Sequence, residues 1–260
     1  MTPELLRYLR FRAPSESSSV CEQYGTENFS FFIYSIVRML RPKTSVELGT
    51  GLGAVTLPWA CALKELGEGT LWSVDNGIDW ESLKASGQGA LGYSDSKETY
   101  ETFISKITET FSLKDHLKCV HQTMTETEFF DPQAPIDLLF TDAPSSSAVG
   151  CLRLLRYYLP KMNWVSQILI DRASTIHHSF LLLESLIDDF NNRRIPASIL
   201  EGLSQSDAQK IQNLVWNSKW QLVHLTDHAV NKKNPQQNSR AWIKIEPFDL
   251  MPRSYATTFF

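Results

Sequence analysis

The feature that most constrains this sequence is a run of three alternate glycines, Gly49, Gly51 and Gly53. The run follows a short β-type stretch at residues 46–48 and precedes a helical pattern over residues 54–66. A glycine-rich turn between a strand and a helix lets the backbone turn sharply and come close to a ligand. We therefore expect a binding crevice at the carboxyl end of the first strand of an α/β sheet.

Strand and helix patterns alternate along the rest of the chain. Strands are expected at residues 46–48, 70–74, 117–121, 136–141, 167–170, 221–225 and 241–245. Helices are expected at residues 28–40, 54–66, 97–111, 148–159, 174–190 and 207–216. This alternation predicts an α/β fold with a doubly wound, mostly parallel, Rossmann-like sheet of seven strands. The last two strands are joined by a polar loop and predict a C-terminal antiparallel hairpin.

The length of 260 residues suits one large domain with additions. We divide the chain into an N-terminal arm, residues 1–27, and a single domain, residues 28–260. The arm is expected to be mobile or to cover the site. Insertions are expected near residues 77–95 and 193–217. Aromatic side chains in them would either close over a substrate or anchor their loops: Trp80, Tyr93 and Trp216.

The amino-acid composition limits the kinds of partner that the protein is expected to bind. The net charge of −4 and the lack of basic blocks argue against nucleic acid, and no apolar run is long enough for a membrane span or a signal peptide. The four cysteines are far apart, which favours reduced core thiols over a metal or disulfide framework. We expect a cytoplasmic protein with a small-molecule substrate, and a homodimer is left open.

Two kinds of nucleotide ligand fit the glycine turn. Gly49, Gly51 and Ala54 follow the spacing of dinucleotide-binding turns. Asp75, at the end of the second expected strand, would accept hydrogen bonds from ribose hydroxyls in either case. Glu47 separates the two interpretations, because its carboxylate would repel a pyrophosphate and favour a ligand with a cationic centre.

The segment from Val46 to Gly53, Val-Glu-Leu-Gly-Thr-Gly-Leu-Gly, resembles the first motif of the class I S-adenosylmethionine-dependent methyltransferases. The resemblance covers roughly residues 29–246, including the seven-strand order with its terminal hairpin. It implies that S-adenosylmethionine is the cofactor, with its methionine part over the glycines, its ribose on Asp75 and its adenine near residues 121–123. The residues expected to bind it are Glu47, Gly49, Thr50, Gly51, Gly53, Asp75, Asn76, Thr123 and Asp142.

Asp142 and Asp171 end two expected strands and should face the same crevice. Small O-methyltransferases of the catechol type, which the chain resembles here, have an aspartate in each place, with asparagine after the second, and hold Mg²⁺ there. The resemblance makes Asp142 and Asp171 candidate metal ligands. Arg172 replaces the asparagine, however, and a guanidinium cannot be a ligand, so the resemblance leaves Mg²⁺ in doubt.

Without a metal, Asp142 is a candidate base or a group that orients the acceptor. Asp171 is a candidate catalytic group, or it forms a structural ion pair with Arg172, which could instead bind a substrate carboxylate. His178 is a candidate general base at a helix start, where a solvated cap is the alternative. The leading interpretation is methyl transfer to a small molecule, on a hydroxyl oxygen. The alternatives are an NAD(P)-dependent oxidoreductase and a non-catalytic methyltransferase-like binding subunit.

Overall fold

The structure is a computed structural model that describes residues 1–14, 16, 19–22, 27–124, 129–142, 147–173, 178–226 and 239–248. Its strands are β1 (Thr44–Leu48), β2 (Thr70–Asp75), β3 (Leu117–His121), β4 (Ile136–Thr141), β5 (Met162–Asp171), β6 (Ser218–Thr226) and β7 (Ser239–Pro247). Its helices are α1 (Pro3–Arg10), α2 (Glu27–Leu40), α3 (Thr56–Leu66), α4 (Trp80–Ala90), α5 (Tyr100–Thr110), α6 (Ala148–Tyr158), the 3₁₀ helix η2 (Leu159–Lys161), α7 (His178–Asn191), α8 (Ala197–Leu200) and α9 (Gln205–Asn217).

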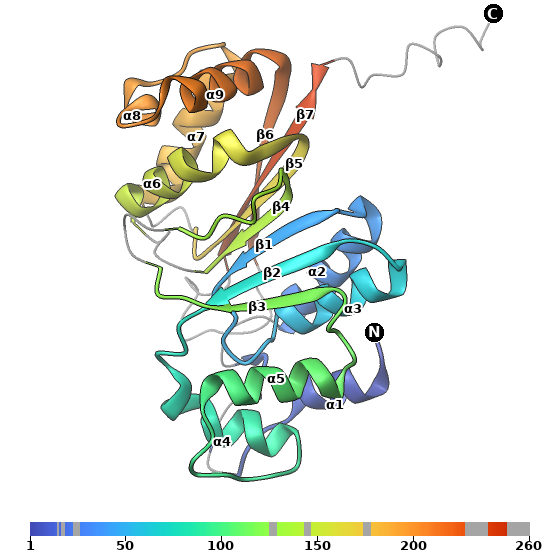
Figure 1. Cartoon of the computed structure of the whole chain (residues 1–260). Helices are drawn as coiled ribbons and strands as arrows, with labels where there is room; N and C mark the ends of the chain where they lie inside the picture. The colour runs from blue at the N-terminus through green and yellow to red at the C-terminus, as the bar shows by residue number, and fades with distance from the viewer. Residues whose placement is uncertain are drawn as a thin grey trace, which may run out of the picture.

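The strands form one sheet in the order β3-β2-β1-β4-β5-β7-β6 (Figure 1). Strands β1 to β5 are parallel, and β7 runs antiparallel to both β5 and β6. The doubly wound sheet with a C-terminal hairpin, predicted from the sequence, is therefore confirmed. The strands at 117–121 and 136–141 have the predicted bounds, whereas both hairpin strands are longer than expected because they pair along their whole length.

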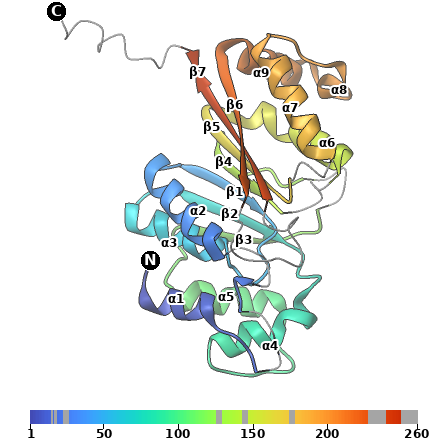
Figure 2. The same ribbon diagram turned by 180° about the vertical axis from the view of Figure 1, so that it is seen from behind.

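Two hydrophobic cores lie on opposite faces of the sheet. Side chains of α1 to α5 form the first core, and those of α6 to α9 form the second. Figure 1 shows α6, α7 and α9 on one face, while Figure 2 shows α2 and α3 on the other. The alternate residues of β1 divide accordingly, since Val46 and Leu48 belong to the second core and Glu47 faces the first.

The N-terminal segment contains a packed helix over Pro3–Arg10, and its role as a mobile arm or a cover over the site stays a prediction. The Thr2 hydroxyl caps α1 by accepting a hydrogen bond from the Leu5 amide at 3.2 Å. Leu5 and Tyr8 are buried, and the Tyr8 ring meets Phe111 at the end of α5 edge-on. Figure 2 shows α1 beside α5, and the Tyr8 hydroxyl of α1 reaches the Leu52 carbonyl in the glycine turn.

The first expected insertion, near residues 77–95, contains the helix α4. We predicted an inserted loop there because the stretch is rich in Gly and Ser and long for a connection, but two of its glycines serve close packing inside a helix. A methyl group on Gly87 would lie 2.8 Å from the Phe103 ring, and one on Gly89 would lie 2.8 Å from the Phe11 ring. In the second insertion, the helix predicted at 207–216 is α9, and the Ser204 hydroxyl caps it.

No helix among the described residues is long and apolar enough to cross a membrane.

Candidate functional site

A cavity of about 300 Å³ lies at the carboxyl edge of the sheet, beside the glycine turn. The turn supplies one wall, and the ends of β2, β4 and β5 supply another. Its lining includes six of the residues expected to bind the cofactor: Gly49, Thr50, Gly51, Asp75, Asn76 and Asp142. A crevice at the carboxyl ends of parallel strands is where ligands bind in open α/β sheets.

The glycines in the turn have different roles. Gly49, Gly51 and Gly53 have φ angles of 103°, 51° and 81°, which favour glycine over residues with a Cβ. Gly49 and Gly51 line the cavity. Gly53 does not, and a methyl group there would press on Leu57 at 3.0 Å. The first two glycines therefore leave backbone exposed to a ligand, and the third lets the following helix pack.

Asp75 holds the turn in place through three backbone amides. Its Oδ2 atom accepts hydrogen bonds from the amides of Thr50 at 2.8 Å and Gly51 at 2.9 Å. Its Oδ1 atom accepts one from Gly77 at 2.7 Å. The carboxylate joins the end of β2 to the glycine turn, so both walls of the cavity share one anchor.

Two tyrosine hydroxyls hold the carbonyl side of the same turn. Tyr100, the first residue of α5, donates to the Gly51 carbonyl at 2.9 Å. Tyr8, in α1, donates to the Leu52 carbonyl at 2.7 Å. With its amides on Asp75 and its carbonyls on tyrosines, the turn is ordered before a ligand arrives.

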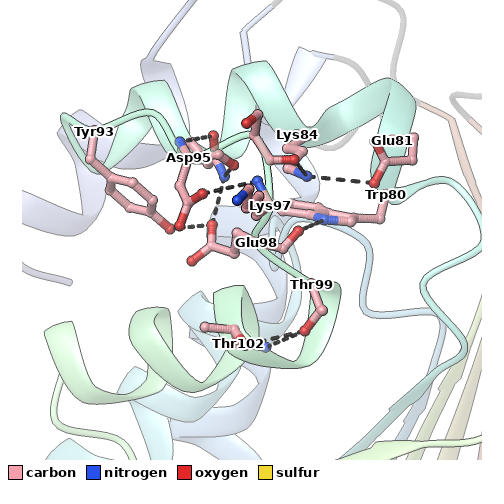
Figure 3. A network of polar contacts seen from close by, with 11 residues as sticks. Trp80, Glu81, Lys84, Tyr93, Asp95, Lys97, Glu98, Thr99 and Thr102 are labelled. Carbon is pink, nitrogen blue, oxygen red and sulfur yellow. Dashed lines mark hydrogen bonds and ion pairs between the residues drawn. The ribbon is translucent and has the colours of Figure 1, made fainter.

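The α4 segment forms a fixed wall of the cavity. Trp80 is buried and lines the cavity, its ring stacks on Phe103 at 4.6 Å, and its Nε1 atom donates to the Glu98 carbonyl at 3.0 Å. Figure 3 shows the polar network that ties α4 to the start of α5. The buried Glu98 carboxylate is its centre, because it accepts hydrogen bonds from Tyr93 and Gln88, each at 2.7 Å. Of the three aromatic residues noted in the insertions, Trp80 alone lines the cavity.

Four charged residues meet at the ends of β4 and β5. Arg240 of β7 is the cross-strand partner of Asp171 and forms an ion pair with it at 2.7 Å, with both side chains buried. The Nε atom of Arg172 lies 3.1 Å from Asp142 and 3.9 Å from Asp171. Asp142 also lies against the glycine turn, because its Cβ atom is 3.4 Å from where a Cβ on Gly49 would stand.

Burial sets the protonation of the two carboxyls. It raises the pKa of Asp171 to about 7, against the lowering effect of Arg240, while the nearby Asp142 raises it further. Burial also raises the pKa of Asp142, which Arg172 opposes. Burial therefore favours the protonated form of both carboxyls at this end of the cavity.

This donor set does not fit Mg²⁺. The ion takes octahedral oxygen ligands, and here two guanidinium groups already lie against the two aspartates. In the part of the chain that the structure describes, no group of three or more His, Cys, Asp or Glu residues is placed to hold a metal ion.

Comparison with known proteins gives a domain match and related folds. A family model described as a methyltransferase domain matches residues 46–171, from β1 to the end of β5. A protein from Klebsiella pneumoniae assigned as an O-methyltransferase has a similar structure, with a TM-score of 0.50, 15% identity and coverage of 95% of this chain and 91% of that one. The S-adenosylhomocysteine-bound methyltransferase of Podospora anserina follows with a TM-score of 0.48, 14% identity and coverage of 95% and 89%. A search of curated proteins found no match.

The chain has the fold of a class I methyltransferase and carries a methyltransferase domain match over residues 46–171. The family match spans the glycine turn and both aspartates, and the sheet has the strand order expected for this class. The resemblance noted in the sequence is confirmed, and with it an enzyme that depends on S-adenosylmethionine.

In the methyltransferase, Glu47 lies behind the cavity and does not line it. It is fully buried, and its Oε2 atom accepts a hydrogen bond from the Ser73 hydroxyl at 2.6 Å. The Ser73 hydroxyl is in turn 2.6 Å from that of Thr50 in the turn. Burial raises the pKa of Glu47 to about 8, although the hydroxyls of Ser73 and Thr56 act to lower it. Glu47 reaches the turn through Ser73, and its contact with the cofactor stays a prediction.

Three further predicted residues stand in different positions. Asn76 lines the cavity, and its Oδ1 atom accepts a hydrogen bond from the Ile78 amide at 3.1 Å. Thr123 is exposed and does not line the cavity, whereas its neighbours Gln122 and Met124 do. His178 begins α7, and its side chain lies outside the described residues.

The sequence did not point to Arg240 or to the two tyrosines of the turn. Arg240 meets Asp171 only through the register of β5 and β7, and no local pattern gives that register. Tyr8 and Tyr100 are distant in sequence from the carbonyls that they bind. If the apolar periodicity of residues 80–90 had been given more weight than their glycines, the sequence would have indicated the wall that Trp80 forms.

Proposed function

We propose that this methyltransferase methylates a hydroxyl oxygen of a small molecule and does so without a metal ion. The observation that carries the proposal is the position of the Asp142 carboxyl, in the cavity and against Gly49 of the cofactor turn. A hydroxyl held there would lie between the cofactor and a proton acceptor.

The cavity has the groups that this cofactor needs. Gly49 and Gly51 would lie under its methionine part, and Asp75 would accept from its ribose hydroxyls, since its Oδ1 atom accepts only one amide and retains acceptor capacity. Gln122 and Met124 would lie beside its adenine. When bound, S-adenosylmethionine supplies the methyl group from its sulfonium centre.

The protein's part is to position the acceptor and remove a proton. Methyl transfer is an in-line displacement, so the acceptor oxygen must be held opposite the methyl group. Asp142 would accept the proton that the hydroxyl loses, while the bound cofactor would give up its methyl group by cleavage of the sulfur–carbon bond and leave as S-adenosylhomocysteine. The buried Asp171 lies next to Asp142 with a raised pKa and can share that proton. Whether His178 assists stays a prediction from the sequence.

The site disfavours the dinucleotide alternative. A pyrophosphate at a glycine turn needs free backbone amides. In this turn the amides of Thr50 and Gly51 already donate to the Asp75 carboxylate, whose charge would repel phosphate. The remaining expectations from the sequence stay predictions: a cytoplasmic location, no nucleic-acid partner and a possible homodimer.

A thermal-shift panel tests the proposal, with S-adenosylmethionine, S-adenosylhomocysteine, NAD and NADP, each with and without Mg²⁺. A ligand at a hundred times its dissociation constant stabilises the native state by about 2.7 kcal/mol. We expect the first two ligands to stabilise the protein and Mg²⁺ to add nothing. Stabilisation by NAD or NADP would contradict the cofactor assignment, and further stabilisation by Mg²⁺ would contradict the metal-free site.

A further inference from the structure

Arg172 stands at the cavity in a conformation that arginine rarely adopts. It follows the last residue of β5, has a φ of 57° and lines the cavity with its side chain 47% exposed. For a residue with a Cβ, this left-handed conformation costs roughly 1–2 kcal/mol. Strained backbone of this kind gathers at binding and catalytic sites.

The neighbouring carboxylates leave much of the Arg172 guanidinium free. Arg240 already pairs with Asp171 at 2.7 Å, whereas the Nε atom of Arg172 is 3.9 Å from it. Arg172 has one close partner, Asp142, which its Nε atom meets at 3.1 Å. Its two terminal nitrogens make no hydrogen bond with the described residues, and the shortest contacts of Arg172 with both aspartates are made by Nε. In the cluster of Asp142, Asp171, Arg172 and Arg240, the positive charges of the two guanidinium groups balance the negative charges of the two carboxylates. The cluster therefore does not repel an anion.

We propose that the terminal nitrogens of Arg172 bind a carboxylate of the acceptor, so that the enzyme methylates small hydroxy acids. This inference rests on the proposed function. The two nitrogens form a planar fork that matches a carboxylate and fixes its orientation. The carboxylate would anchor the acceptor beside Asp142, with the hydroxyl toward the glycine turn.

The other walls define the rest of the acceptor. Trp80, Leu83 and Phe140 line the cavity and present apolar surface. The exposed Ile78 adds apolar surface near the same wall. An acceptor with an apolar or aromatic body, one carboxylate and one hydroxyl matches this arrangement.

The test compares Arg172→Gln and Arg172→Lys with Arg41→Gln as the control. Arg41 also has a left-handed φ, of 52°, and a side chain that is 56% exposed and paired with one glutamate, Glu68, but it does not line the cavity. The probes are 2-, 3- and 4-hydroxybenzoate and 3-(4-hydroxyphenyl)propionate, each with its primary amide. Their dissociation constants are measured by calorimetry in the presence of S-adenosylhomocysteine, whose own affinity is measured first.

We expect the wild type and Arg41→Gln to bind at least one acid tenfold or more tightly than its amide. Arg172→Gln should lose this preference, a change of about ten- to a hundredfold for a charge-assisted pair, and Arg172→Lys should keep part of it. Unchanged affinity for S-adenosylhomocysteine in Arg172→Gln would show an intact cofactor site.

The inference is overturned if the wild type prefers no acid over its amide, or if Arg172→Gln keeps the preference. Both results apply when S-adenosylhomocysteine binds, so they leave the proposed function standing. A wild type that fails to bind S-adenosylhomocysteine would instead overturn the proposed function, and this inference with it.

Discussion

Replacing Gly77 by alanine should damage the cofactor site through Tyr100. Gly77 has a φ of 65°, and a methyl group built on it would lie 2.6 Å from Cδ1 and 2.7 Å from Cγ of the Tyr100 ring. Tyr100 is 8% exposed and has little room to move away. If its ring shifts, its hydroxyl leaves the Gly51 carbonyl, and one side of the turn is released.

The magnitude follows from a matched glycine. Gly92 has a φ of 79°, and a methyl group there would meet nothing within 4 Å. Gly92→Ala should therefore cost only the backbone strain, roughly 1–2 kcal/mol. Gly77→Ala should cost the same backbone strain and two further terms. Overpacking against Tyr100 adds about 1–3 kcal/mol, and the lost Tyr100 hydrogen bond adds about 1 kcal/mol.

Urea denaturation would measure the stability of both variants, and calorimetry would measure their affinity for S-adenosylhomocysteine. We expect Gly77→Ala to be less stable than Gly92→Ala by about 2–4 kcal/mol, from the terms above, and to bind the ligand more weakly. Equal stabilities with equal affinities would refute the view that Tyr100 holds the turn.

Three further predictions concern the acidic residues. Asp75→Asn removes one of the two acceptor oxygens that hold three backbone amides. We expect the variant to lose about 2 kcal/mol of stability and to bind S-adenosylhomocysteine more weakly. Wild-type values in both assays would contradict the view that Asp75 holds the turn in place. The pKa of Glu47 rises from 4.5 in the unfolded chain to about 8 in the native state, so the stability that it adds is present below pH 4.5 and is lost as pH rises through about 8. Glu47→Gln should remove that part of the pH dependence, which is up to about 1.4 kcal/mol per pH unit, and identical pH profiles would exclude Glu47 as its source. Asp142→Asn should lower turnover by about a hundredfold or more while leaving cofactor affinity within a few-fold, and unchanged turnover would rule out its role as proton acceptor.

The sequence predicted the features that local pattern controls. The apolar run that became β4 and the glycines of the turn each have a signature within a few residues. The hairpin could be predicted because two strand patterns flank a polar loop, and its strands are β6 and β7. These features depend on backbone preferences and on burial, and the residue types within a short segment indicate both.

The features that the sequence missed depend on contacts between distant segments. The direction of Glu47 is set by its register opposite Ser73 in β2, and the pairing of Asp171 is set by its register opposite Arg240. The alternation of apolar Val46 and Leu48 with a polar residue did hold a clue, because it places Glu47 on the opposite face of a buried strand.

The two tyrosines on the glycine turn have a consequence for synthesis on the ribosome. Tyr8 leaves the ribosome well before the Leu52 carbonyl that it binds, and Tyr100 follows the Gly51 carbonyl by 49 residues. The Tyr8 bond can close once Leu52 has emerged, but the Tyr100 bond closes only after the start of α5 has emerged. Until then the nascent chain cannot offer the cofactor a finished turn, so S-adenosylmethionine cannot stabilise the first half of the protein while it is being made.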